Sequence, residues 1–573
     1  MPYRAPTSDF RFLLSHVVGF PEVQQTERFA EATDDTTDAI LNEAAKLCDE
    51  VLAPLQRAGD LHPARIENGV VRCSPGFAEG YAAIRDGGWV GISAPAAFGG
   101  LALPQTLATC VNEMMSGACL ALQLNPLMTQ GQIEALEHHA DDALKALYLP
   151  RLISGEWSGT MNLTEPHAGS DVGALTSKAS DNGDGTYAVT GQKIYISWGD
   201  NDFTPNICHL VLARLPGGGP GTKGISLFLV PKFLPDAAGE PGQPNSLQVV
   251  SLEHKMGLHG SPTAVMQYDG ATGWLVGEPH QGMKAMFTMM NNARLGVGVQ
   301  GIGQAEAACQ LALEHALTRK QGRTASGAET IIGHPDVRRM LGQMRADTFA
   351  ARGIALMNAV ATDMAHATGS ADWQARAAFL TPITKAFGTD TGVRTAELGM
   401  QVHGGMGFIE ETGAAQIYRD VRVTSIYEGT NGIQALDLVG RKLADGGEAA
   451  HRLLDEIEQV AEAARAQLPV QAKAVWSGSE SLREVTEWLA QQPLADRGAV
   501  ATAYLRAFAR VLGGHVHLCA ANAEFAETGQ PGPRNRLACF YVQRLLSELG
   551  GLLVEVRSGP GCVDALTAED LAG

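Results

Sequence analysis

A strand-rich stretch over residues 159–282 interrupts a sequence that otherwise has helical periodicity, and this stretch most restricts the folds open to the chain. Within it, β-branched and aromatic residues alternate in short runs, of which 187–190 and 193–197 are the clearest. Asn182-Gly183 is a typical tight turn between strands. On both sides, apolar residues recur at spacings of three and four, which is typical of amphipathic helices. The order therefore predicts helices, then a β domain, then helices.

The length of 573 residues indicates several domains, because single hydrophobic cores stop growing well below this size. We predict an N-terminal extension, an N-terminal α-helical domain, a central β domain, a helical domain and an additional C-terminal helical domain. Their boundaries are 1–35, 36–158, 159–282, 283–445 and 446–573. Inside the last domain, Trp476-Ser-Gly-Ser479 predicts a break between two helices.

The charge balance narrows the function classes. A formal net charge of −19 disfavours nucleic acid as a partner, since phosphate backbones are bound by clustered Lys and Arg. No apolar run approaches the roughly 20 residues of a membrane span, and the N-terminus lacks a secretory pattern. Nine scattered cysteines without metal-ligand spacing indicate reduced thiols. We expect a cytoplasmic protein with no membrane span and no metal site.

Two segments of the β region carry candidate binding groups. The loop 164–171, with sequence Thr-Glu-Pro-His-Ala-Gly-Ser-Asp, concentrates hydroxyls, carboxylates and a glycine. Its backbone N–H groups and hydroxyls could bind the polar edge of a flavin or a diphosphate. A capped turn would use the same residue types. The strand 193–197 ends in aromatics and a hydroxyl that could lie against an isoalloxazine ring. An ordinary half-buried strand remains the alternative.

Two further segments lie in the helical region that follows. Arg294 and Arg319 are 25 positions apart, which places them on nearly one face of a helix, and arginine can bind phosphate through paired hydrogen bonds. Surface ion pairs are the alternative. The cluster 401–408 contains three glycines after a helix and could approach a nucleotide closely. It does not follow a strand, so a Rossmann motif is disfavoured.

Glu428 is the sharpest catalytic candidate. It follows the apolar run 423–427 and precedes a Gly-Thr turn. Removal of this carboxylate from water would raise its pKa toward the range of a general base. The ordinary alternative is a solvated glutamate or one that caps a helix. The apolar run before Glu428 disfavours ordinary solvation.

Five segments in this order resemble the acyl-CoA dehydrogenase family across residues 36–442. They are the loop 164–171, the Gly-Gln-Lys run 191–193, the helix containing Arg294, the Gly-Gly-x-Gly cluster 404–407 and the Tyr-Glu-Gly-Thr run 427–430. The resemblance implies an α+β multidomain fold with an N-terminal helical domain, a central β-barrel-like domain and a C-terminal four-helix bundle, here followed by an extra C-terminal helical domain. It also implies FAD as the cofactor, bound between these domains.

The resemblance further implies α,β-dehydrogenation of an acyl-CoA thioester to a trans-2-enoyl-CoA. Glu428 would remove the α-proton, and the β-hydrogen would pass as hydride to flavin N5. The backbone N–H of Glu428 and a flavin ribityl hydroxyl would polarise the thioester carbonyl. Electron-transferring flavoprotein would be the electron acceptor.

The family's binding residues carry over position by position. The cofactor-binding matches are Leu163, Thr164, Ser170, Tyr195, Ser197, Arg319, Gln401, His403, Gly404, Gly405 and Thr430. The substrate-binding matches are Ser170, Arg294, Tyr427 and Gly429. Because Arg319 and the segment 401–405 match contacts to the FAD of a neighbouring subunit, the resemblance implies a homo-oligomer, as a dimer or a dimer of dimers.

Three positions depart from or refine this pattern. Tyr195 stands where the family often has tryptophan against the flavin, and Gly432 stands where many members have glutamine. Some members take their base from the position before the arginine equivalent to Arg294, but here that residue is Ala293. Alanine cannot accept a proton, which favours Glu428.

The two extensions, with the opening Met-Pro-Tyr-x-Ala-Pro, resemble the extended subgroup that oxidises 3-methylmercaptopropionyl-CoA in bacterial dimethylsulfoniopropionate catabolism. The product would be methylthioacryloyl-CoA. A medium- or long-chain fatty acyl-CoA dehydrogenase of β-oxidation is the first alternative. A DNA-binding flavoprotein relative without dehydrogenase activity is a second, but the residues after Gly446 hold 11 Lys and Arg against 16 Asp and Glu. A flavin monooxygenase-type relative is a third, which the retained Glu428 disfavours.

Overall fold

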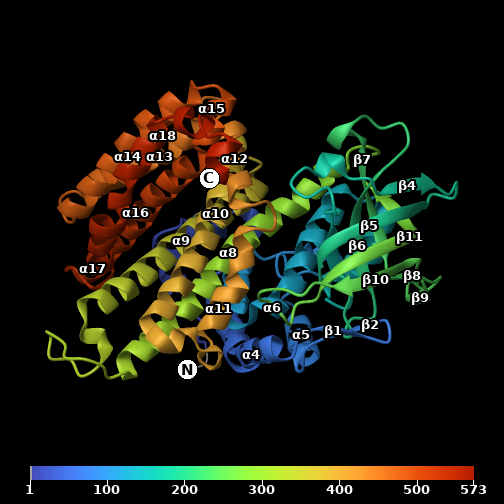
Figure 1. Cartoon of the computed structure of the whole chain (residues 1–573), viewed down its shortest axis with the longest axis horizontal. Coiled ribbons are helices and arrows are strands. Elements are labelled where there is room, and N and C mark those ends of the chain that lie inside the picture. The colour runs from blue at the N-terminus through green and yellow to red at the C-terminus, as the bar shows by residue number, and fades with distance from the viewer. Residues whose placement is uncertain (1–2) are drawn as a thin grey trace.

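The computed structural model describes residues 3–573, so Met1 and Pro2 of the opening motif lie outside the described residues (Figure 1). The β domain and the C-terminal helices lie on opposite sides of the long central helices. Ahead of the β domain come α1 (Thr7–His16), α2 (Phe20–Gln24), α3 (Asp34–Lys46), α4 (Ala53–Leu61), β1 (Arg65–Glu67), β2 (Val70–Arg72), α5 (Phe77–Asp86), α6 (Gln105–His139) and α7 (Asp142–Ile153).

The buried helix α6 is broken at Cys119, where the backbone leaves helical geometry at φ −155° and ψ 88°. Two side chains bind carbonyls close to this break. Gln304 donates to the carbonyl of Ser116 at 2.7 Å, and the indole N–H of Trp198 donates to the carbonyl of Ala121 at 3.2 Å. The break therefore joins α6 to both the later helices and the β domain.

The central domain is built on one seven-stranded sheet. Its strands are β3 (Ser158–Asn162), β4 (Lys178–Asp181), β5 (Tyr187–Ser197), β6 (Ile207–Arg214), β7 (Ile225–Pro231), β10 (Leu247–Leu252) and β11 (Thr263–Val276). The pairing β11–β5–β4–β6–β7–β11 returns to its first strand, but β4 meets β6 only at Lys178 and Arg214. We therefore describe a sheet and not a clear barrel.

Two expectations for this region change. The runs 187–190 and 193–197 form the single strand β5, which passes Gly191 at φ +149°. A side chain at Gly191 would collide with the Ser177 hydroxyl, since its Cβ would lie 2.2 Å from the Ser177 Oγ. The many Gly and Pro residues of 235–246 predict a surface loop, but β9 (Pro241–Pro244) lies there and pairs with β8 (Phe233–Pro235) in a hairpin.

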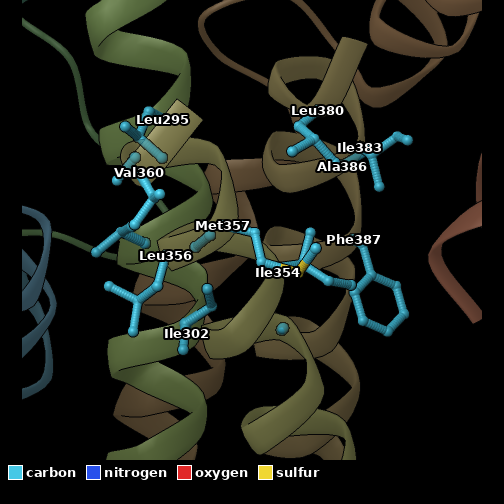
Figure 2. Close-up of a cluster of buried hydrophobic side chains, with 14 of the residues drawn as sticks. Leu295, Ile302, Ile354, Leu356, Met357, Val360, Leu380, Ile383, Ala386 and Phe387 are labelled. Atoms are coloured by element: carbon cyan, nitrogen blue, oxygen red, sulfur yellow. The ribbon is translucent and has the colours of Figure 1, made fainter. Parts of the chain in front are cut away.

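The helical domain that follows contains α8 (Gly282–Thr318), α9 (Pro335–Thr368), α10 (Ala371–His403), α11 (Ala414–Val421) and α12 (Asn431–Gly440). The three long helices lie side by side, and α11 and α12 pack against α10. Figure 2 shows the core between them, in which Leu295 and Ile302 of α8 and Leu356 of α9 lie on one side and Phe387 of α10 on the other. This core fixes the positions from which α8 and α10 present polar residues.

The C-terminal domain covers α9, α10 and α12 mainly through its longest helix, α16 (Ala501–Thr528). Its other helices are α13 (Glu448–Ala464), α14 (Pro469–Ala490), α15 (Leu494–Ala499), α17 (Pro533–Phe540), α18 (Leu549–Arg557), α19 (Gly561–Asp564) and α20 (Ala568–Ala572). The predicted break at Trp476–Ser479 is wrong, because α14 runs through it. Gly478 sits near Leu549, and the buried Ser479 hydroxyl donates to Glu458 at 3.0 Å.

By length and composition alone, one helical stretch among residues 3–573 could cross a membrane, namely Pro533–Arg557. A core helix of a globular protein meets the same criteria. Here a π-helical turn and a 3-10 turn separate α17 from α18 inside this stretch. Both α17 and α18 pack against α16, so the stretch is part of the C-terminal helical domain.

A buried ionic network joins the N-terminal extension to three other parts of the chain. Arg352 of α9 is fully buried, and its guanidinium binds Glu113 of α6 at 2.7 Å and Glu306 of α8 at 2.8 Å. It also binds Asp9 of α1 at 3.2 Å. On the other side, Asp9 lies 3.5 Å from Arg534 of α17. Burial raises the pKa of Glu113 to about 7, although Arg352 opposes that shift.

Candidate active site

Glu428 lies in a tight loop between a 3-10 turn (Arg422–Ser425) and α12. Its φ is +57°, and Gly429 follows at φ +85°. A left-handed glutamate is strained, and such strain gathers at functional sites. The side-chain amide of Gln434 donates to the carbonyls of Glu428 and Gly429 at 3.3 and 3.2 Å, which stabilises the turn. Thr430 caps α12 by accepting from the N–H of Ile433 at 3.3 Å.

The Glu428 carboxyl is half-buried between cationic side chains of two helices. Removal from water raises its pKa to about 7, and the charges of Arg294 and Lys385 oppose this rise. A carboxyl that titrates near neutral pH can accept a proton under working conditions and still bind it firmly. The geometry therefore suits a general base.

Arg294 lies on α8 with its side chain almost entirely buried. It is 3.9 Å from the carboxylate of Asp437 and 3.4 Å from the side-chain oxygen of Asn291. Within residues 3–573 its Nε has no hydrogen-bond partner. Burial lowers its pKa, against the charges of Asp437 and Glu428. A buried guanidinium with unused donors is suited to a polar ligand beside Glu428.

Tyr427 is fixed by a chain of hydrogen bonds through the buried side-chain amides of Gln300 and Gln123. Its hydroxyl binds the side-chain oxygen of Gln300, and the Gln300 amide donates to Gln123 at 2.9 Å. Burial raises the pKa of Tyr427 well above its usual range, so its hydroxyl stays protonated. This chain of contacts links the Glu428 loop to both α8 and α6.

A cavity of about 620 Å³ opens beside Arg294, between the ends of α6, α8, α9 and α10. Asp437 and Lys442 line it next to Arg294, and Arg28 of the N-terminal extension also reaches its wall. A second hollow, of about 410 Å³, lies between the tip of the β domain and the start of α8, and Lys223 and Lys284 line it. The larger cavity has room for a cofactor-sized or drug-sized ligand.

The loop 164–171 is held in place by a buried ion pair that sequence reasoning did not identify. Glu165 lies 2.8 Å from the ammonium of Lys193, which also donates to the carbonyl of Leu163 at 2.9 Å. The same carboxylate accepts from the N–H groups of Thr176 and Ser177 at 2.7 and 3.0 Å. Burial raises the pKa of Glu165, but Lys193 and these donors outweigh it and hold the pKa at about 2. Glu165 is therefore a structural anchor of the loop.

The residues predicted to hold FAD in this region present free polar groups and an exposed ring. The hydroxyls of Thr164, Ser170 and Ser197 make no hydrogen bond to any described residue, and Leu163 is half-buried beside them. The Tyr195 side chain is 61% exposed at φ +61°. The carbonyl of Thr164 accepts from the N–H of Ile194 at 2.9 Å, so the loop lies against this part of β5. Unpaired hydroxyls with an aromatic ring fit the polar edge and face of a flavin.

The remaining predicted cofactor residues form a second, distant group. Arg319 is exposed just after α8 ends, roughly 38 Å along the helix from Arg294, so these arginines do not share a site. His403 at the end of α10 stacks on His315 of α8 with 4.3 Å between ring centres. This contact brings the ends of both helices together. The other members are all exposed: Gln401, Gly404 and Gly405.

Comparison with known proteins identifies the class. Models of the acyl-CoA dehydrogenase N-terminal, middle and C-terminal domains match residues 34–156, 160–271 and 280–443. A model described as acetyl-CoA dehydrogenase C-terminal like matches 453–567. The chain belongs to the acyl-CoA dehydrogenase family, which confirms the resemblance and the fold of helical, sheet and helical domains.

Among individual relatives, the chain is 48% identical over 465 residues to 3-methylmercaptopropionyl-CoA dehydrogenase from Ruegeria pomeroyi, covering 80% of this chain and 79% of that protein. It is 34% identical over 484 residues to the broad-specificity linear acyl-CoA dehydrogenase FadE5 from Mycobacterium tuberculosis, covering 80% and 78%. The chain is thus an oxidoreductase of the acyl-CoA dehydrogenase type.

Two solved structures support the fold alone. Caenorhabditis elegans ACDH-11, solved in complex with C11-CoA, superposes with a TM-score of 0.80 at 20% identity, covering 94% of this chain and 91% of that one. The acyl-CoA dehydrogenase from Bacillus anthracis, solved with FAD, gives 0.77 at 20% identity, covering 100% and 94%. Both alignments include the additional C-terminal helices.

Proposed function

We propose that this enzyme oxidises an acyl-CoA thioester to its trans-2-enoyl-CoA with Glu428 as the base that removes the α-proton. The single observation that carries the proposal is the position of the Glu428 carboxyl in a left-handed loop beside Arg294 and Lys385, where removal from water raises its pKa to about 7. A carboxyl with this pKa is about half deprotonated at pH 7, and it binds the proton it accepts more firmly than an ordinary glutamate does.

The backbone around Glu428 supplies a second catalytic element. Its N–H makes no hydrogen bond to any residue in the part of the chain that the structure describes. An N–H that is fixed and unused can donate to a thioester oxygen as negative charge develops there. Tyr427 and Gly429 would border the bound acyl group, and Arg294 would bind a polar part of the substrate.

FAD fits the face formed by Leu163, Thr164, Ser170, Tyr195 and Ser197, with Thr430 beside the catalytic loop. When bound, FAD would accept the β-hydrogen as hydride at N5 and so complete the oxidation. The group of Arg319, Gln401, His403, Gly404 and Gly405 would contact the FAD of a second subunit in a homo-oligomer. Electron-transferring flavoprotein is the proposed acceptor of the electrons, in the cytoplasm.

The proposed substrate is 3-methylmercaptopropionyl-CoA, with methylthioacryloyl-CoA as the product. The 48% identical relative of that name supports this choice. The lysines at the second hollow would suit the phosphates of CoA. Medium- or long-chain fatty acyl-CoA is the alternative substrate, favoured by the similarity to FadE5.

Flavin reduction by a panel of acyl-CoAs would test both levels of the proposal. The informative pair is 3-methylmercaptopropionyl-CoA and pentanoyl-CoA, because the two acyl chains differ only by sulfur in place of a methylene. Octanoyl-CoA tests the longer-chain alternative. If no acyl-CoA bleaches the flavin, the dehydrogenase proposal fails. If octanoyl-CoA is the best substrate, only the assignment of the acyl chain fails.

The rate of flavin reduction should fall on the acid side of about pH 7. Glu428 must be deprotonated to act as a base, and its pKa is raised to about 7, so below that pH most of the carboxyl carries a proton and cannot remove the α-proton. The rate constant for flavin reduction at saturating substrate should therefore drop about tenfold for each pH unit below the midpoint. A flat profile between about pH 5 and pH 8 would contradict the assignment.

A further inference from the structure

A buried lysine lies directly behind the loop that carries Glu428. Lys385 belongs to α10 and is fully buried. Its ammonium donates to the side-chain oxygen of Asn431 at 2.9 Å. Asn431 is the first residue of α12, three positions after Glu428. A lysine without exposure to water is rare, and this one touches the catalytic loop through a single side chain.

The Asn431 side chain ties the loop to a whole turn of α10. Its amide donates to the hydroxyl of Thr389 at 3.0 Å and to the carboxylate of Asp390 at 2.7 Å. A weaker contact reaches the carbonyl of Ala386 at 3.4 Å. Because Lys385 donates to the side-chain oxygen, both the oxygen and the nitrogen of the Asn431 amide are hydrogen-bonded to α10. The start of α12 is therefore fixed against α10, and the loop before it has little freedom to move.

Lys385 also acts on Glu428 through charge. Burial lowers the pKa of Lys385 to about 8, and the charges of Glu428 and Asp390 oppose that shift, so the ammonium is mostly retained at neutral pH. Burial alone would raise the pKa of Glu428 further, because Lys385 and Arg294 both lower it. Of these two cations, Arg294 faces the cavity and also interacts with Asp437, whereas Lys385 is enclosed.

Other charged groups surround this arrangement from each neighbouring element. Asp437 of α12 and Arg441, the residue after α12, act on Arg294, and Tyr427 lies beside Glu428 in the loop. Around Asp390, Arg422 of the 3-10 turn and Arg506 of α16 add positive charge. The charges that act directly on the Glu428 carboxyl are those of Arg294 and Lys385. Removal of Lys385 would thus leave Arg294 as the principal opposing charge.

We propose that Lys385 is a positioning residue for the dehydrogenation: through Asn431 it fixes the Glu428 loop against α10, and its ammonium keeps the Glu428 carboxyl in the charged form that accepts the proton. This inference rests on the proposed role of Glu428 as the base. Lys385 would make two contributions: its hydrogen bond to Asn431 fixes the loop, and its charge stabilises the Glu428 carboxylate. Different substitutions remove each one.

Three variants separate these contributions. Lys385→Met removes the charge and the hydrogen bond, Lys385→Arg keeps the charge, and Asn431→Ala removes the link but keeps the ammonium. The first readout is the pH profile of flavin reduction by the best acyl-CoA. The second needs no turnover: the infrared band of the protonated Glu428 carboxyl is titrated in the protein without substrate and identified by its absence in Glu428→Gln.

We expect Lys385→Met to move both the acid limb and the infrared titration upward by about one pH unit or more, with about tenfold slower reduction at pH 7 and recovery near pH 9. Lys385→Arg should restore the wild-type midpoint. Asn431→Ala should lower the maximal rate several-fold without moving the midpoint. Lys255→Met is the matched control: it removes a half-buried lysine, which donates to the carbonyl of Ser261 at 3.0 Å, and should leave the midpoint in place.

The proposal is overturned if Lys385→Met leaves both midpoints where they are in the wild type, or if Lys255→Met moves them equally. If the wild-type protein oxidises no acyl-CoA, the proposed function is contradicted instead. In that case the infrared titration still reports whether Lys385 controls the charge of Glu428.

Discussion

Glu428→Gln is expected to retain FAD and to lose flavin reduction by roughly 10³-fold or more. Glutamine has nearly the same shape, so the left-handed loop and its contact with Gln434 should persist. The amide cannot accept the α-proton at any working pH. Stopped-flow bleaching of the flavin with saturating acyl-CoA would measure the loss.

A matched control replaces a carboxylate of the C-terminal helical domain that does not line the cavity beside Arg294. Glu448→Gln changes an exposed glutamate in the first turn of α13 and should reduce flavin at the wild-type rate. A near-normal rate in Glu428→Gln would show that another group is the base. Loss of FAD from the same variant would leave the rate uninterpretable, so the absorbance ratio of flavin to protein is measured first; cofactor loss itself would contradict the expectation that the loop persists.

Arg352→Met is expected to destabilise the protein by about 3–5 kcal/mol, because removing one partner of a buried ion pair leaves the other charge uncompensated. Here three carboxylates, Asp9, Glu113 and Glu306, bind the same guanidinium, although Arg345 also pairs with Asp9 and Glu306. Chemical denaturation of the FAD-loaded enzyme would measure the loss. Arg339→Met is the control, since its ion pair with Asp336 is exposed and should contribute less than about 1 kcal/mol.

The loss in Arg352→Met should shrink at lower pH. Without the guanidinium, the buried carboxylates have raised pKa values, and protonation relieves the cost of burying their charge. Stability relative to the wild type should therefore be worse at pH 8 than at pH 5.5. An equal loss at both pH values would mean that Arg352 acts mainly through packing, including its contact with the ring of Phe10 at 5.1 Å.

Local patterns in the sequence were sufficient for the order of helices and strands and for Glu428. Alternation and turn residues mark β5 and its neighbours, and an apolar run before a Gly-Thr turn marks the tight loop that carries Glu428. The break in α6 at Cys119 has no such pattern, because contacts from Gln304 and Trp198, distant in sequence, accompany it. At Trp476–Ser479 the local sequence predicts a helix break that does not form. There the packing of α14 against α18 outweighs the weak tendency of glycine and serine to end a helix.

The supporting residues of the site could not be inferred from spacing. Lys385 and Asn431 are 46 positions apart, and the role of each exists only once α10 and α12 are packed together. Glu165 shows a related limit. Its place in the loop 164–171 gives no sign of a partner, because Lys193 lies 28 positions away and only the fold shows that the two side chains meet.

The contact between Asp9 and Arg534 bears on how this enzyme can be divided. Asp9 lies in the N-terminal extension and Arg534 in the C-terminal domain. The same Asp9 carboxylate also binds the buried Arg352 of α9. Cutting the chain after the central helices would remove Arg534, uncover α9 and α10, and separate Arg510 from Asp347. The extension and the tail therefore meet on the central helix α9, and removing either one would leave part of the buried ionic network without its partner.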